Sequence, residues 1–293
     1  MATYVKGEAV KNATSYELYE KNGSKYDYLA TNEGEINFEV EGLGLGGGKH
    51  LLAVKAKAEG YADSDYSDTV EYKESTPPLI NISMEDGTNT GLGGSNYNAT
   101  SYGDATFSNG KFSTANGSGY IKIPIDFISS KTSKFTAFFV FDNWTKGGEK
   151  YGRFFRFNSD VPNTYLNDPT VTNGNYSIRF KLLNNFTTTV ADYINGEILK
   201  KESASDYYYI PVTAGEKIAI AVRCDGNKYS YWKDGILVAT TLCTNATPSP
   251  CTWEYLSVGN DTTQYSLGSM ECSKIMLWND ALTDSEMAML VEE

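Results

Sequence analysis

The chain has 293 residues, 40% of them hydrophobic and 22 of them tyrosine, which is enough for packed cores in two domains. Its formal net charge of −12 argues against nucleic acid or an anionic membrane as a partner, because phosphate binding needs clustered Lys and Arg. No stretch approaches the roughly 18 apolar residues of a membrane span, and no basic region followed by an apolar core opens the chain, so we expect neither membrane insertion nor a signal peptide.

Strand patterns fill the first 75 residues. Residues 16–20 alternate between apolar and polar positions, and Asn22-Gly23-Ser24 predicts a turn after them. Further strands are expected over 36–40, over 50–57 with its even-numbered residues on one face, and over 67–72. A period of two between clusters of turn residues is typical of β-sandwiches and barrels, so we predict an all-β fold.

Three segments, Asn12–Tyr19, Gly48–Ala58 and Gly60–Ser67, resemble bacterial or phage fibronectin type III domains. The resemblance covers nearly all of residues 1–75 and implies a small fibronectin III/Ig-like sandwich. It also implies a first strand that is either truncated or supplied from elsewhere, because little chain precedes Asn12. Residues 76–79 include two prolines and are expected to form a stiff Pro-rich linker.

Residues 80–293 resemble laminin-G-like jelly rolls of the concanavalin A type. The resemblance rests on four segments: Gly119–Pro124 and Phe135–Val140 as opening strands, Lys228–Gly235 as a hairpin, and Tyr265–Glu286 as the closing pattern. The resemblance implies a larger concanavalin A-like jelly-roll sandwich. It says little about ligand, because this fold serves lectins, adhesion modules, glycosidases and inert spacers.

One segment near the C-terminus reads as a short helix. Thr283 and Glu286 have the spacing of a capping box, in which each side chain satisfies a backbone N–H of the other residue. Leu282 and Met287 stand where a hydrophobic staple would hold the first turn.

Catalytic patterns are missing from the sequence. Retaining glycosidases of this fold carry paired carboxylates in one strand, and no such pair occurs in the second domain. His50 is the only histidine, lies in the small domain and looks structural, so nucleophilic triads are excluded. The run Gly42–Gly47 matches G-x-G-x-x-G, but a strand pattern follows it where a dinucleotide site needs a helix. We therefore predict that the protein is not an enzyme.

Calcium is common in the laminin-G-like family, and Asp86 and Asp142 are the candidate ligands here. The family's usual Asp-x-Ser-Gly-Asn pattern does not follow Asp86, so ordinary turn aspartates are the competing interpretation.

All four cysteines lie in the last 70 residues, with no CxxC pair. A Cys243–Cys251 bridge, a Cys224–Cys272 bridge and buried free thiols all stay open.

A candidate sugar site follows from strand parity. In Tyr151–Asn158 the alternation places Phe154, Arg156 and Asn158 on one face, and in Tyr176–Lys181 it places Arg179 on the solvated face. If the two strands are neighbours, Arg156 and Arg179 lie side by side and can grip a carboxylated sugar with paired hydrogen bonds. Asn143 and Trp144 are expected to supply an amide and a stacking ring. The alternatives are arginines that pair with acids to solubilise the sheet, and a site in the loops around Trp253 and Tyr265.

These observations favour a non-enzymatic glycan-binding or adhesion protein. Domains of an extracellular type without an export signal suggest a phage virion surface protein, such as a head fibre, decoration or tail-associated protein, made in the host cytoplasm. Its expected partners are carbohydrate on a bacterial or mucosal surface and, through the N-terminal domain, other virion proteins. A homo-oligomer is also compatible with the sequence. The alternatives are a bacterial cell-surface glycan-binding protein expressed without its signal peptide, and a purely structural virion assembly protein.

Overall fold

The computed structural model describes most of the chain. The described residues are 3–115, 118–128, 133–146, 151–159, 178–183, 192–198, 206–226, 228–242, 253–260 and 267–292. They form two compact units, one of residues 1–76 with 283–286 and one of residues 77–282 with 287–293. Each unit is described by itself below.

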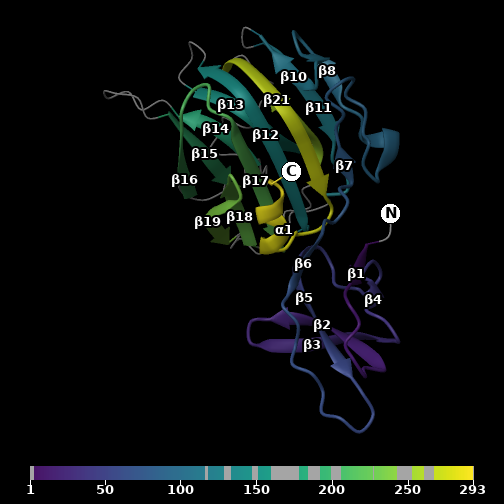
Figure 1. The fold of residues 1–293 in the computed structure, drawn as a ribbon. Coiled ribbons are helices and arrows are strands. Elements are labelled where there is room, and N and C mark those ends of the chain that lie inside the picture. The colour runs from purple at the N-terminus through teal and green to yellow at the C-terminus, as the bar shows by residue number, and fades with distance from the viewer. Residues whose placement is uncertain are drawn as a thin grey trace. The chain divides into compact units, whose positions relative to one another are not determined.

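The first unit consists of two antiparallel sheets. One pairs β1 (Tyr4–Lys6) with β4 (Asn37–Glu39), and the other has the order β3 (Lys25–Glu33), β2 (Ser15–Asn22), β5 (Gly48–Lys57), β6 (Val70–Glu74) (Figure 1). The core between them includes Tyr16, Leu18, Phe38 and Leu52. Even-numbered residues of β5 from His50 to Ala56 are buried, as the alternation predicts.

His50 is part of this packing. It is 7% exposed, and its ring nitrogens lie 2.7 Å from Glu20 Oε1 and 3.1 Å from the Gly46 carbonyl. Both ring nitrogens therefore have partners inside the unit.

The sequence pattern did not predict two strands of this unit, and a third strand begins later in the chain than predicted. β3 was not predicted because, as an edge strand, it is polar and largely exposed, and β1 is only three residues long. β6 begins at Val70 rather than at Ser67. Before it, the hydroxyls of Ser64 and Ser67 accept hydrogen bonds from the backbone N–H groups of Ala56 and Val54, so side-chain oxygens take the place of backbone carbonyls as acceptors there.

The second unit is a sandwich of two larger sheets. Within the described residues, one sheet has eight strands, in the order β19-β18-β17-β12-β21-β10-β9 with β7 beside β21, and the other has seven, in the order β16-β15-β14-β13-β20-β11-β8. The first comprises β7 (Ile80–Asn81), β9 (Thr106–Ser108), β10 (Lys111–Thr114), β12 (Phe135–Lys146), β17 (Ile218–Asp225), β18 (Lys228–Lys233), β19 (Ile236–Leu242) and β21 (Leu267–Trp278). The second comprises β8 (Thr100–Tyr102), β11 (Tyr120–Pro124), β13 (Tyr151–Ser159), β14 (Ile178–Leu183), β15 (Asp192–Ile198), β16 (Asp206–Val212) and β20 (Trp253–Gly259). A short 3-10 helix, η1 (Gly94–Tyr97), precedes β8.

Aromatic side chains from both sheets fill the space between them. Phe139 of β12 stacks on Phe155 of β13 with ring centroids 4.1 Å apart, and Phe135 meets Phe157 at 5.4 Å. All four rings are completely buried. The all-β fold class, with two-sheet sandwiches and a short C-terminal helix, is thus confirmed.

The C-terminal helix α1 (Asp284–Met289) contributes to a second apolar cluster, on the other face of the eight-stranded sheet. Its capping box forms as expected: the Thr283 hydroxyl accepts from the Glu286 N–H at 3.2 Å, and the Glu286 carboxylate accepts from the Thr283 N–H at 2.8 Å. Leu282 and Met287 are both buried in the cluster. No helix in the described part of the chain is long and apolar enough to cross a membrane.

Two of the cysteines can be placed. Cys224 and Cys272 are buried free thiols, so they do not form a bridge. Burial raises the pKa of the Cys272 thiol to about 12. Cys243 and Cys251 lie outside the described residues.

Candidate functional site

The two arginines of the predicted sugar site are neighbours in the seven-stranded sheet. β13 and β14 pair antiparallel, and Arg156 stands directly opposite Arg179. The side chain of Arg179 lies outside what the structure describes, so its position is known only through the backbone register.

The prediction that the Arg156 side chain lies on a solvated face is wrong, because this side chain is buried. A β-bulge between Arg153 and Phe155 breaks the strand parity, so that Phe154 and Phe155 both face the core. Arg156 lies on the opposite face from Phe155, but it is only 4% exposed. It stands on a central strand, with Ser257 of β20 on one side and Arg179 on the other, and Ser257 is itself fully buried.

Asn143 and Trp144 do not join these arginines. Both belong to β12, in the other sheet. Asn143 is exposed there, but Trp144 is fully buried, packs edge-on against Phe154 and donates its Nε1–H to the Glu216 carbonyl at 3.1 Å. The expected stacking ring is therefore a core residue that no sugar can reach.

The two candidate calcium ligands have protein partners. Asp86 Oδ1 accepts from the N–H and the hydroxyl of Thr88 at 3.0 and 2.7 Å, and these bonds lower the pKa of its carboxyl. Asp142 Oδ1 lies 3.6 Å from the ammonium of Lys217. The described residues contain no group of three or more His, Cys, Asp or Glu side chains that could hold a metal ion. Asp86 thus has the geometry of an ordinary turn aspartate.

A different set of side chains meets on the outer face of the seven-stranded sheet. In β11, Ile121 and Ile123 are fully buried in the core, while Tyr120, Lys122 and Pro124 alternate with them and are half-buried. Register places Tyr102 of β8 opposite Tyr120, and Ser257 of β20 opposite Lys122. Alternating positions of a strand face opposite sides, so all of these side chains share the face turned away from the core.

Three of these residues and Tyr255 of β20, which stands opposite Pro124, form a cluster that we call the tyrosine–lysine face: Tyr102, Tyr120, Lys122 and Tyr255. The rings of Tyr102 and Tyr120 stack with centroids 4.9 Å apart and planes within 8°. The Lys122 ammonium lies 4.3 Å from the Tyr255 ring centroid and 5.2 Å from that of Tyr102. Tyr102 is 39% exposed, so the cluster is open to solvent at its β8 side.

Lys122 is held by aromatic rings rather than by a carboxylate. Its contacts with Tyr102 and Tyr255 are cation–π interactions, each worth about 0.5–1 kcal/mol at an exposed site. No acidic side chain of the described residues forms an ion pair with it, although the chain carries 37 acids. Among the described residues, the contacts of the ammonium are therefore with rings and not with a carboxylate.

The same face continues across the sheet as a row of polar residues. From Lys122 the register leads through Ser257 and Arg156 to Arg179. The row thus begins with a lysine at the open side, has two arginines at its centre and continues from Arg179 to Glu197 of β15. Rings beside a cation suit a ligand with an apolar face and an anionic group.

Tyr120 and Lys122 were expected in a strand but were not predicted to take part in a site. Parity alone could have placed both on a solvated face, because isoleucines alternate with them. The contribution of Tyr102 could not be anticipated, since its strand has three residues and no apolar alternation. Trp253, named as an alternative, has its backbone in β20, and Tyr265 lies outside the described residues.

No family model and no curated protein matches the sequence. Among solved structures, the chain is similar to the binding domain of botulinum neurotoxin DC in complex with rat synaptotagmin II, with a TM-score of 0.50 and 11% identity over 73% of this chain and 51% of that one. It is also similar to the botulinum neurotoxin serotype D ligand-binding domain in complex with N-acetylneuraminic acid (TM-score 0.49, 8% identity, 73% and 50% covered). A third match is a pentraxin from Limulus polyphemus (TM-score 0.38, 12% identity, 56% and 71% covered). The chain spans about half the length of the toxin domains, and at such identity the likeness shows the fold alone.

Proposed function

We propose that the protein is a non-enzymatic glycan-binding protein whose ligand lies on the tyrosine–lysine face. The observation that carries the proposal is Lys122, an ammonium placed between Tyr102 and Tyr255 without a carboxylate partner among the described residues. Among the described lysines, Lys122 lies over two tyrosine rings, whereas Lys6, Lys21 and Lys55 each lie over one.

The chemistry of the face favours an anionic sugar. Tyrosine rings offer flat apolar surfaces on which the apolar side of a pyranose can lie, at little cost in side-chain entropy. A carboxylate or sulfate on that sugar would gain a charge-assisted hydrogen bond from Lys122.

A glycan array probed with the whole chain tests the proposal. Binding to carboxylated or sulfated glycans is expected, with Lys122→Gln weakening it about tenfold or more through the lost charged hydrogen bond. Tyr102→Ala should weaken it as well. Lys228→Gln is the matched control, because Lys228 is an exposed lysine of β18 in the other sheet. Equal binding by Lys122→Gln and Lys228→Gln proteins would reject this face as the site.

The absence of turnover is part of the proposal. Residues of the tyrosine–lysine face include no carboxylate, whereas glycoside hydrolysis needs a general acid and a second carboxylate. Purified protein is expected to release no reducing ends from β-glucans, galactans or host polysaccharides. Release that disappears on replacing a single carboxylate of the second unit would overturn the non-enzyme assignment.

We further propose, from the sequence resemblances, that the protein works on the surface of a phage virion. Mass spectrometry of purified particles should then find it at the copy number of a structural protein. Recovery from bacterial membranes with a processed N-terminus would instead favour a bacterial surface glycan-binding protein. Particles that contain the protein but bind no glycan would favour a purely structural assembly role.

A further inference from the structure

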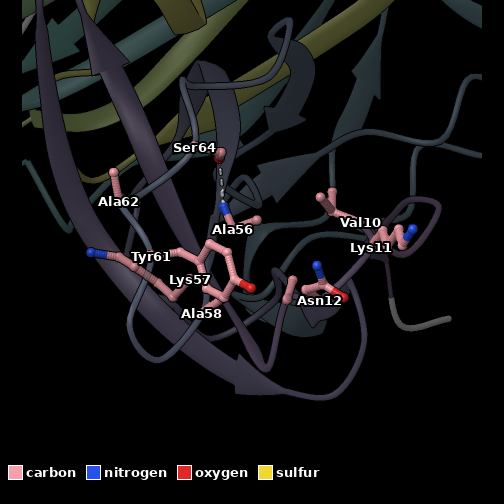
Figure 2. A pocket seen from close by; sticks show the side chains of 10 residues that line it. Val10, Lys11, Asn12, Ala56, Lys57, Ala58, Tyr61, Ala62 and Ser64 are labelled. Atoms are coloured by element: carbon pink, nitrogen blue, oxygen red, sulfur yellow. Dashed lines mark hydrogen bonds between the residues drawn. The ribbon is translucent and has the colours of Figure 1, made fainter.

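A pocket opens on the first unit, apart from the tyrosine–lysine face of the second. It has a volume of about 170 Å³ and lies between the turn Val10–Ala13 and the loop Ala58–Ser64, with the end of β5 as its floor (Figure 2). A cavity of about 150 Å³ is large enough for benzene, so this pocket can take one six-membered ring.

Hydrogen bonds between backbone groups and hydroxyl side chains help to hold both walls in place. Val10 donates its N–H to the Tyr16 hydroxyl at 2.8 Å, which ties the first wall to a core residue. On the other side, Ser64 binds Ala56 twice, through its own N–H at 3.1 Å and through the Ala56 N–H at 2.8 Å. The pocket is therefore built before any ligand arrives, which lowers the entropy cost of binding.

Two side chains that line the pocket have polar groups without a hydrogen-bond partner among the described residues. Tyr61 is 69% exposed, with no ring or hydroxyl contact, and Figure 2 shows its hydroxyl end pointing toward Asn12. The Asn12 amide has no hydrogen-bond partner in the described residues, and Asn12 has a left-handed backbone with φ of 69°. Lys57, in contrast, extends away from Tyr61 and forms ion pairs with Glu17 and Asp63.

We infer that this pocket binds a single pyranose ring of a glycan, as a site independent of the tyrosine–lysine face. The ring lies with its apolar side against Tyr61, and two neighbouring hydroxyls exchange hydrogen bonds with the Asn12 amide, which offers both a donor and an acceptor. Val10, which is 49% exposed, supplies the apolar wall on the opposite side. One aromatic plate, one amide and a preformed ring-sized hollow together fit a sugar better than a charged or extended ligand.

NMR titration of the whole chain tests this inference. The probes are the methyl glycosides of glucose, galactose, mannose and glucuronic acid at millimolar concentrations. At least one of them should shift the amide resonances of Ala13 and Ala58 saturably. Tyr61→Ala should weaken that binding about tenfold. Asn12→Gly should weaken it too, and glycine keeps the left-handed backbone, so the fold is preserved.

Two controls separate the pocket from other effects. Tyr28→Ala removes an exposed tyrosine of the same unit that does not line the pocket, and should leave the titration unchanged. Lys122→Gln should also leave it unchanged, so failure of the face and failure of the pocket are distinguishable. The inference is overturned if none of the four glycosides shifts Ala13 and Ala58, or if Tyr61→Ala and Asn12→Gly proteins titrate like the wild type.

Discussion

Replacing Trp144 with phenylalanine tests whether this ring belongs to the core or to a ligand site. Its Nε1–H bond to the Glu216 carbonyl ties β12 to the turn before β17, where Gly215 in return donates its N–H to the Trp144 carbonyl at 2.9 Å. Losing the side-chain bond costs about 0.5–1.5 kcal/mol. The smaller ring also leaves a gap beside Phe154, at a cost similar to that of one or two missing methylenes.

The expected loss for Trp144→Phe is thus about 2 kcal/mol in the free energy of unfolding of the second unit. For a domain of this size that corresponds to a melting temperature lower by roughly 4–8 °C. The assay is thermal and urea unfolding of the whole chain followed by circular dichroism. Glycan binding by the folded variant should be unchanged.

Asn143→Ala is the matched control, since it alters the exposed neighbour on the same strand and should change stability by less than about 0.5 kcal/mol. A Trp144→Phe protein that is as stable as the wild type but no longer binds glycan would refute the core assignment and restore the ring to the site.

Three further outcomes follow from individual contacts. Thr283→Ala removes the N-cap of α1 and should destabilise the protein by about 1 kcal/mol in urea unfolding, whereas an unchanged midpoint would contradict the capping box. The hydrogen bond from the Tyr19 hydroxyl lowers the pKa of Glu17. The pair therefore stabilises the fold fully above the ordinary glutamate pKa, and this contribution is lost as the pH falls through the lowered pKa. Acid unfolding of the Glu17→Gln protein should show a weaker pH dependence in that range. Because burial raises the Cys272 pKa to about 12, iodoacetamide at pH 8 should leave the Cys272 peptide unlabelled in native protein and label it in urea, as peptide mass spectrometry can show.

Several local features could be predicted from the sequence because their causes are local. The alternation in β5 places its apolar side chains on one face whatever else the chain does. The Thr283–Glu286 spacing specifies a helix start because the two partners lie within one turn. The sequence placed Arg156 beside Arg179 only on the condition that their two strands are neighbours, and the sheet order meets that condition.

The errors arose where a local pattern could not reveal its neighbours. Parity treats a strand as regular, and the bulge at Phe154 shifts that parity by one residue. An aromatic residue at the end of an apolar run can lie on the surface and stack against a ligand, or it can pack in the core. Trp144 is buried because it packs against Phe154 of the other sheet, which the local sequence does not reveal.

The all-β class, the faces of the regular strands and the short capped helix could be predicted because each depends on residues a few positions apart. The candidate site could not be predicted in this way, because Tyr102, Lys122 and Tyr255 come from three strands that meet only through the order of the sheet. The pocket of the first unit has the same origin, since its walls are the turn before β2 and the loop after β5, which antiparallel pairing of these two strands brings side by side.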